Sequence, residues 1–144
     1  MRILGLDHGE RRIGVAVSDA TGTIATPHSV IDRRAGDVRV ALRTLVTELA
    51  VERVVVGLPL LLSGGEGQAA RSARAFADQV AEETGLPVSL QDERYTTVTA
   101  EDALIEGGVS RRRRREVRDK VAAAVMLQSY LDRRTHDDDG EHEA

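Results

Sequence analysis

The sequence predicts an α/β fold built on a mixed five-stranded sheet, with the strands in the order 3-2-1-4-5. Two observations lead to this prediction. The first three apolar runs are separated by short turns, which makes them an antiparallel meander. The last two runs each follow an amphipathic helix, so they are expected to be parallel strands joined by crossovers. The length of 144 residues suits one domain that buries a single core.

The meander occupies the N-terminal part of the chain. Arg2 to Asp7 forms the first strand, which ends on a carboxylate just before the turn at Gly9. Arg12 to Ser18 forms the second strand, in which large apolar residues alternate with small ones. Ile24 to Ile31 forms the third, and because proline cannot donate to a ladder, Pro27 indicates an edge position or a bulge.

The crossovers follow. Apolar residues recur at helical spacing from Val38 to Leu49, and Val54 to Leu58 is a β-branched run typical of a strand buried on both faces. A second helix runs through Ala69 to Val80 and is closed by Gly85. Val88 to Asp92 is the fifth strand. Right-handed crossovers place strands 1, 4 and 5 side by side, which is the arrangement of a ribonuclease H-like fold.

Two more helices are expected in the C-terminal part of the chain. A short one covers about Ala100 to Glu106, and a longer one carries its apolar side chains on one face. Residues 135–144 are very polar and without periodicity, so we expect a disordered acidic tail after a single domain of residues 1–134. The apolar face of the long helix is expected to consist of Val117, Val121, Ala124, Val125 and Leu131.

Composition narrows the possible functions. The chain has no cysteine, which excludes disulfides and thiolate metal sites. It has no apolar run of roughly 18–20 residues and no signal-peptide pattern, so we expect a cytoplasmic protein with no membrane partner. The net charge is −4, but acids gather in the tail and bases in one run. Because aromatics are scarce, contact with nucleic acid would use phosphates and shape rather than base stacking.

Acidic residues follow strands that the fold brings together. The carboxyl ends of strands 1, 4 and 5 form one rim, where open α/β sheets place their ligands. Asp7 ends the first strand, and Asp92 and Glu93 end the fifth. Asp119 lies on the last helix beside the small Ala123. Strand alternation does not choose between Asp92 and Glu93, so the expected cluster is Asp7, Asp119 and one of these two.

Such a cluster predicts a metal site. Converging carboxylates do not all stay ionised without a cation, and oxygen-rich clusters suit Mg²⁺ or Mn²⁺. Two such ions can activate water for phosphodiester cleavage. Each acid also has a simpler interpretation. Asp7 could cap a hairpin, Asp119 could be favoured by the helix macrodipole, and Asp92 and Glu93 could be solvated.

Arginines near these acids are candidates for binding phosphate, because the guanidinium fork matches phosphate oxygens. The alternative is a solvated charged surface. Ser63-Gly64-Gly65 is a weak phosphate-loop candidate and is better read as a connector. His8 is either a metal ligand or proton shuttle, or a turn residue that points elsewhere. The candidate nucleic-acid-binding residues are Arg11, Arg12, Arg94, Arg111, Arg112, Arg113, Arg114 and Arg115.

Several sequence blocks together resemble the YqgF/RuvX family, whose members are described as Holliday junction resolvases and pre-16S rRNA nucleases. The resemblance extends to about Arg133. The loop after Pro59 departs from the family pattern, because it reads Leu-Leu-Leu-Ser-Gly-Gly. The matching blocks are Asp7-His8-Gly9, Arg12 to Asp19, Val56 to Pro59, Asp92 to Thr97, Asp119 to Ala123, and Leu127 to Leu131.

The resemblance implies a ribonuclease H-like fold and a divalent-metal phosphodiesterase, with the family's acids falling on Asp7, Glu93 and Asp119. It therefore selects Glu93 over Asp92. The expected function is a metal-dependent endonuclease that matures the 5′ end of small-subunit rRNA or cuts branched DNA, and the latter would favour a homodimer. The alternatives are a non-catalytic RNA-binding assembly factor and an actin-like ATP-binding domain. The second is disfavoured because the chain has no second Asp-x-Gly lobe.

Overall fold

The structure is a computed structural model that describes residues 1–94 and 110–140, with side chains through Arg134. A mixed sheet forms its centre, and its strand order is β3-β2-β1-β4-β5, which confirms the predicted topology. β1 pairs antiparallel with β2 and parallel with β4. The strands are β1 (Ile3–His8), β2 (Arg12–Ser18), β3 (Ala25–Asp32), β4 (Arg53–Leu58) and β5 (Val88–Asp92).

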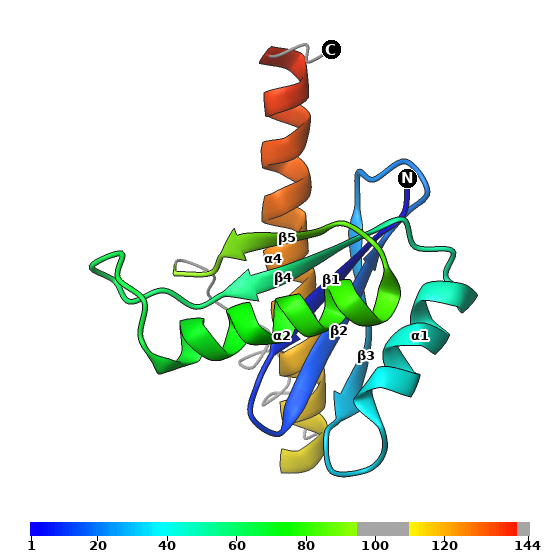
Figure 1. Ribbon diagram of the computed structural model, residues 1–144, viewed down its shortest axis with the longest axis vertical. Coiled ribbons are helices and arrows are strands. Elements are labelled where there is room, and N and C mark those ends of the chain that lie inside the picture. The colour runs from blue at the N-terminus through cyan, green and yellow to red at the C-terminus, as the bar shows by residue number, and fades with distance from the viewer. Residues whose placement is uncertain (95–109, 141–144) are drawn as a thin grey trace.

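Helices cover both faces of this sheet (Figure 1). α1 (Val38–Glu48) and α2 (Gln68–Thr84) lie on one face, and the long α4 (Arg111–Gly140) crosses the other. The ends of α1 and α2 follow from local chemistry. The Asp37 side chain accepts a hydrogen bond from Arg39 N at the start of α1, and Gly85 ends α2 with φ +69°. The short helix expected near Ala100–Glu106 lies outside the described residues.

The edge strand β3 has the irregularity that proline predicts. Val15 pairs with Ser29 and the next residue, Ala16, pairs with Pro27, so His28 is an extra residue on β3. This bulge lies on the outermost strand of the sheet. Both alternatives for Pro27, an edge position and a bulge, are therefore present together.

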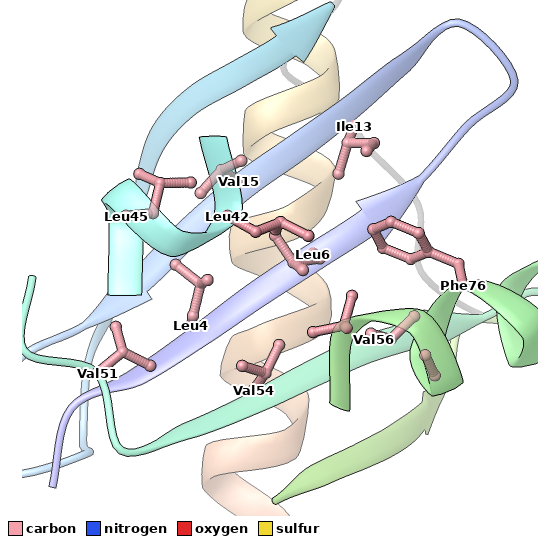
Figure 2. Close-up of a cluster of buried hydrophobic side chains, with 12 residues drawn as sticks. Leu4, Leu6, Ile13, Val15, Leu42, Leu45, Val51, Val54, Val56 and Phe76 are labelled. Atoms are coloured by element: carbon pink, nitrogen blue, oxygen red, sulfur yellow. The ribbon is translucent and has the colours of Figure 1, made fainter. Parts of the chain in front are cut away.

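The main core lies between the sheet and α1 and α2 (Figure 2). Leu4 and Leu6 of β1 point into it from one side, and Leu42 of α1 and Phe76 of α2 close it from the other. Burying each such side chain stabilises the fold by about 1.5–3 kcal/mol. Its buried members are Leu4, Leu6, Ile13, Val15, Leu42, Leu45, Val51, Val54, Val56, Phe76, Ala77 and Val80.

The opposite face carries Ile3 and Val55 but has glycines where α4 crosses, so the helix packs close to the sheet there. A Cβ added to Gly5 would lie 2.9 Å from Leu127 Cβ, and one added to Gly14 would lie 2.1 Å from the Asp119 carbonyl oxygen. This close approach sets the buried face of α4, and the predicted face was partly wrong, because Val125 is 36% exposed. The side chains of α4 that are buried are Ala123, Ala124, Met126, Leu127 and Leu131.

α4 continues to Gly140, six residues into the segment for which the sequence predicts disorder. Extending a formed helix adds one backbone hydrogen bond per residue, whereas starting one is unfavourable, so a polar segment can continue an existing helix. In Figure 1 these last turns project beyond the sheet. The described residues include no helix that could cross a membrane. The division into a domain and a tail stays a prediction.

Candidate active site

Asp7 lies in the middle of a row that crosses the sheet on the α4 face. It pairs with Gly14 of β2 on one side. On the other side Leu6 pairs with Val56, so the next position of the parallel register sets Asp7 beside Gly57 of β4. Because side chains alternate along a strand, Asp7 shares its face with Gly5 and points away from the main core.

The two flanking glycines make room for the other two acids. A Cβ on Gly57 would lie 2.4 Å from Glu93 Cδ, and a Cβ on Gly14 would overlap the backbone of α4 at Asp119. Any other residue at either position would therefore push an acid away from Asp7. The glycines explain how residues from β1, the end of β5 and α4 meet at one place.

Asp7 and Glu93 form a hydrogen-bonded carboxyl pair. Burial, and then the charge and hydrogen bond of Asp7, raise the pKa of Glu93 to about 9. Burial also raises the pKa of Asp7, although its hydrogen bond with Glu93 partly opposes this. The bond favours the charged form of Asp7 and the neutral form of Glu93, so Glu93 donates and Asp7 accepts. Glu93 is therefore the member of the pair that keeps its proton at neutral pH.

Asp119 lies close to this pair but bonds elsewhere. Its charge contributes to the raised pKa of Asp7. Its Oδ2 accepts a hydrogen bond from Arg12 Nε at 2.6 Å, and both side chains are about one quarter exposed. Within the described ranges, no three histidine or acidic side chains are arranged to hold a metal ion together. The donor set is nevertheless suitable, because two buried carboxyls that share a proton would both ionise beside a divalent cation.

The two neighbouring acids at the end of β5 have different environments. Asp92 faces Arg94, with Oδ2 2.8 Å from Arg94 Nη2 and Oδ1 2.8 Å from the Arg94 backbone nitrogen. These hydrogen bonds lower the pKa of Asp92. The geometry thus places Glu93, and not Asp92, beside Asp7.

His8 lies on the opposite face of the sheet from Asp7. Its ring packs against Phe76 with centroids 4.6 Å apart, and its Nε2 is hydrogen-bonded to Arg33 Nη1. Burial, and then the charge of Arg33, lower the pKa of His8 to about 4. His8 is therefore a neutral residue at the edge of the main core and does not face the acids.

A groove of about 720 Å³ begins at Arg12 and runs between the β2–β3 edge and the first turns of α4. Four of the predicted phosphate-binding arginines line it. Arg111, Arg114 and Arg115 border a second hollow of about 320 Å³ together with Arg118. Arg113 is exposed and lines neither. The groove is lined by Arg11, Arg12, His28, Ser29, Val30, Asp32, Ala35, Arg112, Arg115, Glu116 and Lys120.

The loop after Pro59 is closed by its own hydrogen bonds. It closes on itself through hydrogen bonds between the backbones of Leu61, Gly64 and Gly65. Leu62 at its tip is 77% exposed. Gly64 has φ +96° and approaches Arg94, whose Nη1 would lie 3.3 Å from an added Cβ.

Comparison with known proteins identifies the family. Residues 1–133 match the family described as "RuvX: Holliday junction resolvase". The chain belongs to this family.

Curated relatives agree with the RuvX assignment over nearly their whole length. A protein of Moorella thermoacetica is 51% identical over 92% of this chain and 96% of its own, and one of Lactococcus lactis subsp. lactis is 46% identical over 91% and 94%. Both are named "Putative pre-16S rRNA nuclease". RuvC of Thermus thermophilus, solved in complex with a Holliday junction substrate, matches with a TM-score of 0.58 at 17% identity. It covers 94% of this chain and 96% of its own, which confirms the ribonuclease H-like fold of the RuvX-family chain.

Three features of this RuvX-family site were missed from the sequence. The roles of Gly14 and Gly57 are the first two, although an isolated glycine within a strand is a recognised sign of close backbone approach. The third is Gln91, which pairs with Gly57 and is only 6% exposed. Its Oε1 is buried with no hydrogen-bond partner among the described residues. Nothing in the sequence distinguishes Gln91 from an ordinary strand residue.

Proposed function

We propose that this RuvX-family protein is a divalent-metal-dependent endonuclease whose site consists of Asp7, Glu93 and Asp119. The observation that carries the proposal is the buried carboxyl pair of Asp7 and Glu93, which are hydrogen-bonded to each other at the end of the central strand. A groove lined by arginines includes Arg12, which forms an ion pair with Asp119. Acids that bind a cation and bases that bind phosphate are the two parts that hydrolysis of a phosphodiester requires.

Asp7 and Glu93 would hold Mg²⁺ or Mn²⁺, with Asp119 as the third ligand. The ion, when bound, supplies an activated water and neutralises charge on the scissile phosphate. Glu93 gives up its proton on binding, because a metal ligand must be ionised. Gly57 keeps the space in which the Glu93 carboxyl lies. Arg11, Arg112 and Arg115 hold the nucleic-acid backbone along the groove.

The proposed substrate is a structured rRNA precursor cut near the 5′ end of the small-subunit rRNA, as part of ribosome biogenesis in the cytoplasm. Two curated relatives about half identical to this chain carry pre-16S rRNA in their names. A four-way DNA junction is the second substrate, because the family is described by Holliday junctions. The groove contacts suit either, since phosphates carry no sequence information.

The deciding experiment compares the wild type with Asp7→Asn on an rRNA precursor and on a four-way junction, each with Mg²⁺, Mn²⁺ or EDTA. We expect metal-dependent cleavage that falls roughly 100- to 1,000-fold in the variant. Asp78→Asn, on the exposed surface of α2, is the matched control and should cleave like the wild type. Equal cleavage by Asp7→Asn, or cleavage in EDTA, would contradict the proposal.

A second candidate function is a non-catalytic RNA-binding assembly factor. The Arg12–Asp119 ion pair favours it, because it keeps the third acid bonded to a base. This function predicts metal-independent binding of the rRNA precursor that is alike in wild type and Asp7→Asn, with no cleavage by either.

Symmetric cutting of a four-way junction would require two active sites, so we propose a homodimer for that substrate. Sedimentation with and without junction DNA can test this.

A further inference from the structure

Arg12 belongs to two parts of the molecule at once. Its Nε donates to Asp119 Oδ2, beside the carboxyl pair, and its side chain also lines the basic groove. Within the described residues its Nη1 and Nη2 make no hydrogen bond. One guanidinium therefore has one nitrogen bound to the third acid and two nitrogens, with four N–H donors, left for a ligand in the groove.

The backbone on both sides of this ion pair makes close contacts. The Asp119 carbonyl packs directly on Gly14, so α4 cannot move closer to the sheet at this point. On the other side, Gly9 N donates to the Arg12 carbonyl oxygen at 3.0 Å and closes the β1–β2 turn. The side-chain torsions of Arg12 and Asp119 can therefore change the partner of either group without α4 moving closer to the sheet.

Ligands that bind on either side of this ion pair would compete with it: phosphate for Arg12, and a divalent ion for Asp119. The groove carries five cationic and two acidic side chains, so it attracts phosphate. A phosphate bound to Nη1 and Nη2 of Arg12 through two parallel hydrogen bonds competes with Asp119 for the single positive charge of this side chain and draws the guanidinium towards the groove. A divalent ion at Asp7 and Glu93 competes with Arg12 for Asp119 in the same way. Phosphate thus weakens the bond of Arg12 to Asp119, which favours metal binding. The metal ion weakens the same bond from the side of Asp119, which favours phosphate binding.

We propose that the Arg12–Asp119 ion pair is a latch that couples phosphate in the groove to completion of the metal site. With the groove empty, Arg12 holds Asp119 and the site offers two carboxylates. With the nucleic-acid backbone in the groove, Arg12 binds phosphate and Asp119 becomes the third ligand. Arg12 is thus a positioning residue that acts through Asp119. This proposal rests on the proposed function, because it assigns Asp119 to the same metal site.

Linkage makes the latch measurable without cleavage. If phosphate raises the affinity for metal, metal raises the affinity for phosphate by the same factor. The Mg²⁺ dissociation constant is measured by calorimetry with and without a short phosphorothioate DNA hairpin, whose linkages resist hydrolysis. Arg12→Gln removes the latch. Arg115→Gln removes the same charge from the same groove, but Arg115 makes no ion pair with Asp119 in the described structure.

In the wild type we expect the hairpin to tighten Mg²⁺ binding about tenfold more than it does in Arg12→Gln. Arg115→Gln should bind the hairpin more weakly but keep the wild-type coupling. Without the hairpin, Arg12→Gln should bind Mg²⁺ more tightly than Arg115→Gln, because Asp119 has been released. Equal coupling in wild type and Arg12→Gln would overturn the latch.

A second readout uses the wild-type protein and does not depend on the folding of a variant. The Nε–Hε resonance of Arg12 reports its bond to Asp119, and Asp119→Asn supplies the unpaired reference. The hairpin alone should move this resonance towards the unpaired reference, and a resonance that stays in place at saturation would contradict the proposal. If the wild type fails to cleave any substrate, the proposed function is wrong. The calorimetry and the Arg12 resonance would still show whether phosphate and Mg²⁺ binding are coupled through the latch.

Discussion

The two faces of the central sheet differ in the size and charge of their side chains. The face towards α1 and α2 is filled with Leu, Ile, Val and Phe, and it forms the larger of the buried hydrophobic clusters (Figure 2). The face towards α4 has glycines and alanines where the helix crosses and carries the acids at its end. Neighbouring residues of one strand, Leu6 and Asp7, therefore serve stability and the proposed chemistry respectively. The small residues of the second face keep room for charged groups at the expense of packing.

The largest change in stability is expected from Leu6→Ala. Leu6 is fully buried in the main core, so removing most of its side chain leaves a cavity and should lower the free energy of unfolding by about 3 kcal/mol. Urea denaturation measures this value. The activity of the remaining folded protein should be unchanged, which is the opposite of the result for Asp7→Asn. Loss of activity per folded molecule in Leu6→Ala would break the separation between the two faces.

Gly14→Ala tests the close approach of α4. The added Cβ would lie 2.1 Å from the Asp119 carbonyl oxygen, a backbone atom that moves only if the helix moves. We expect a loss of roughly 2 kcal/mol in the free energy of unfolding together with a loss of cleavage. Gly36→Ala is the control, because nothing lies within 4 Å of a Cβ there. Similar stabilities for the two variants would show that α4 is not held against Gly14.

The pH dependence of stability should differ between the faces. Glu93 is protonated in the folded protein up to a pKa of about 9 but loses its proton near pH 4.5 when unfolded. Between these values the folded state binds more protons, so stability falls as pH rises. Glu93→Gln stays neutral and should melt roughly 2–4 °C above the wild type at pH 8 in EDTA.

Mg²⁺ should remove this difference by stabilising the wild type more than Glu93→Gln, because only the wild type offers both carboxylates of the Asp7–Glu93 pair. Thermal melts across pH 5–9, with and without the ion, measure both effects. Glu52→Gln, at an exposed glutamate, is the control and should melt like the wild type. A wild-type curve that is flat across this range would rule out the protonated pair.

The smallest effect is expected for His8→Gln on the other face. The pKa of His8 is lowered to about 4 in the folded protein from an ordinary value of 6.5, so the folded state binds fewer protons in this window. Stability from this residue is present above pH 6.5 and is lost as pH falls towards 4. Gln keeps an acceptor for Arg33, so the variant should match the wild type at pH 7 and exceed it by about 1–2 °C at pH 5. Cleavage should not change.

Sequence reasoning predicted the fold well and the site in part. The strand order follows from short turns and crossovers, which are local signals that the structure confirms. The position of Asp7 at the end of β1 follows from the end of an apolar run. The close contacts at Gly14 and Gly57 do not follow from any local pattern, because they depend on how Asp119 of α4 and Glu93 pack against the sheet. The Arg12–Asp119 pair joins residues 107 positions apart, and no local pattern encodes such a pairing.

The position of α4 in the chain has a consequence for folding during synthesis. β1 carries Asp7 and emerges first, whereas Asp119 lies on a helix that follows every strand of the sheet. The three acids that we propose as the site therefore come together only after the last element has packed, through contacts between the most distant parts of the sequence. A chain still being translated lacks the helix that carries Asp119 until every strand has been made, so it has no assembled site. The proposed cleavage activity would thus begin only once the whole domain has been synthesised, and the unfinished chain would be harmless to nearby RNA.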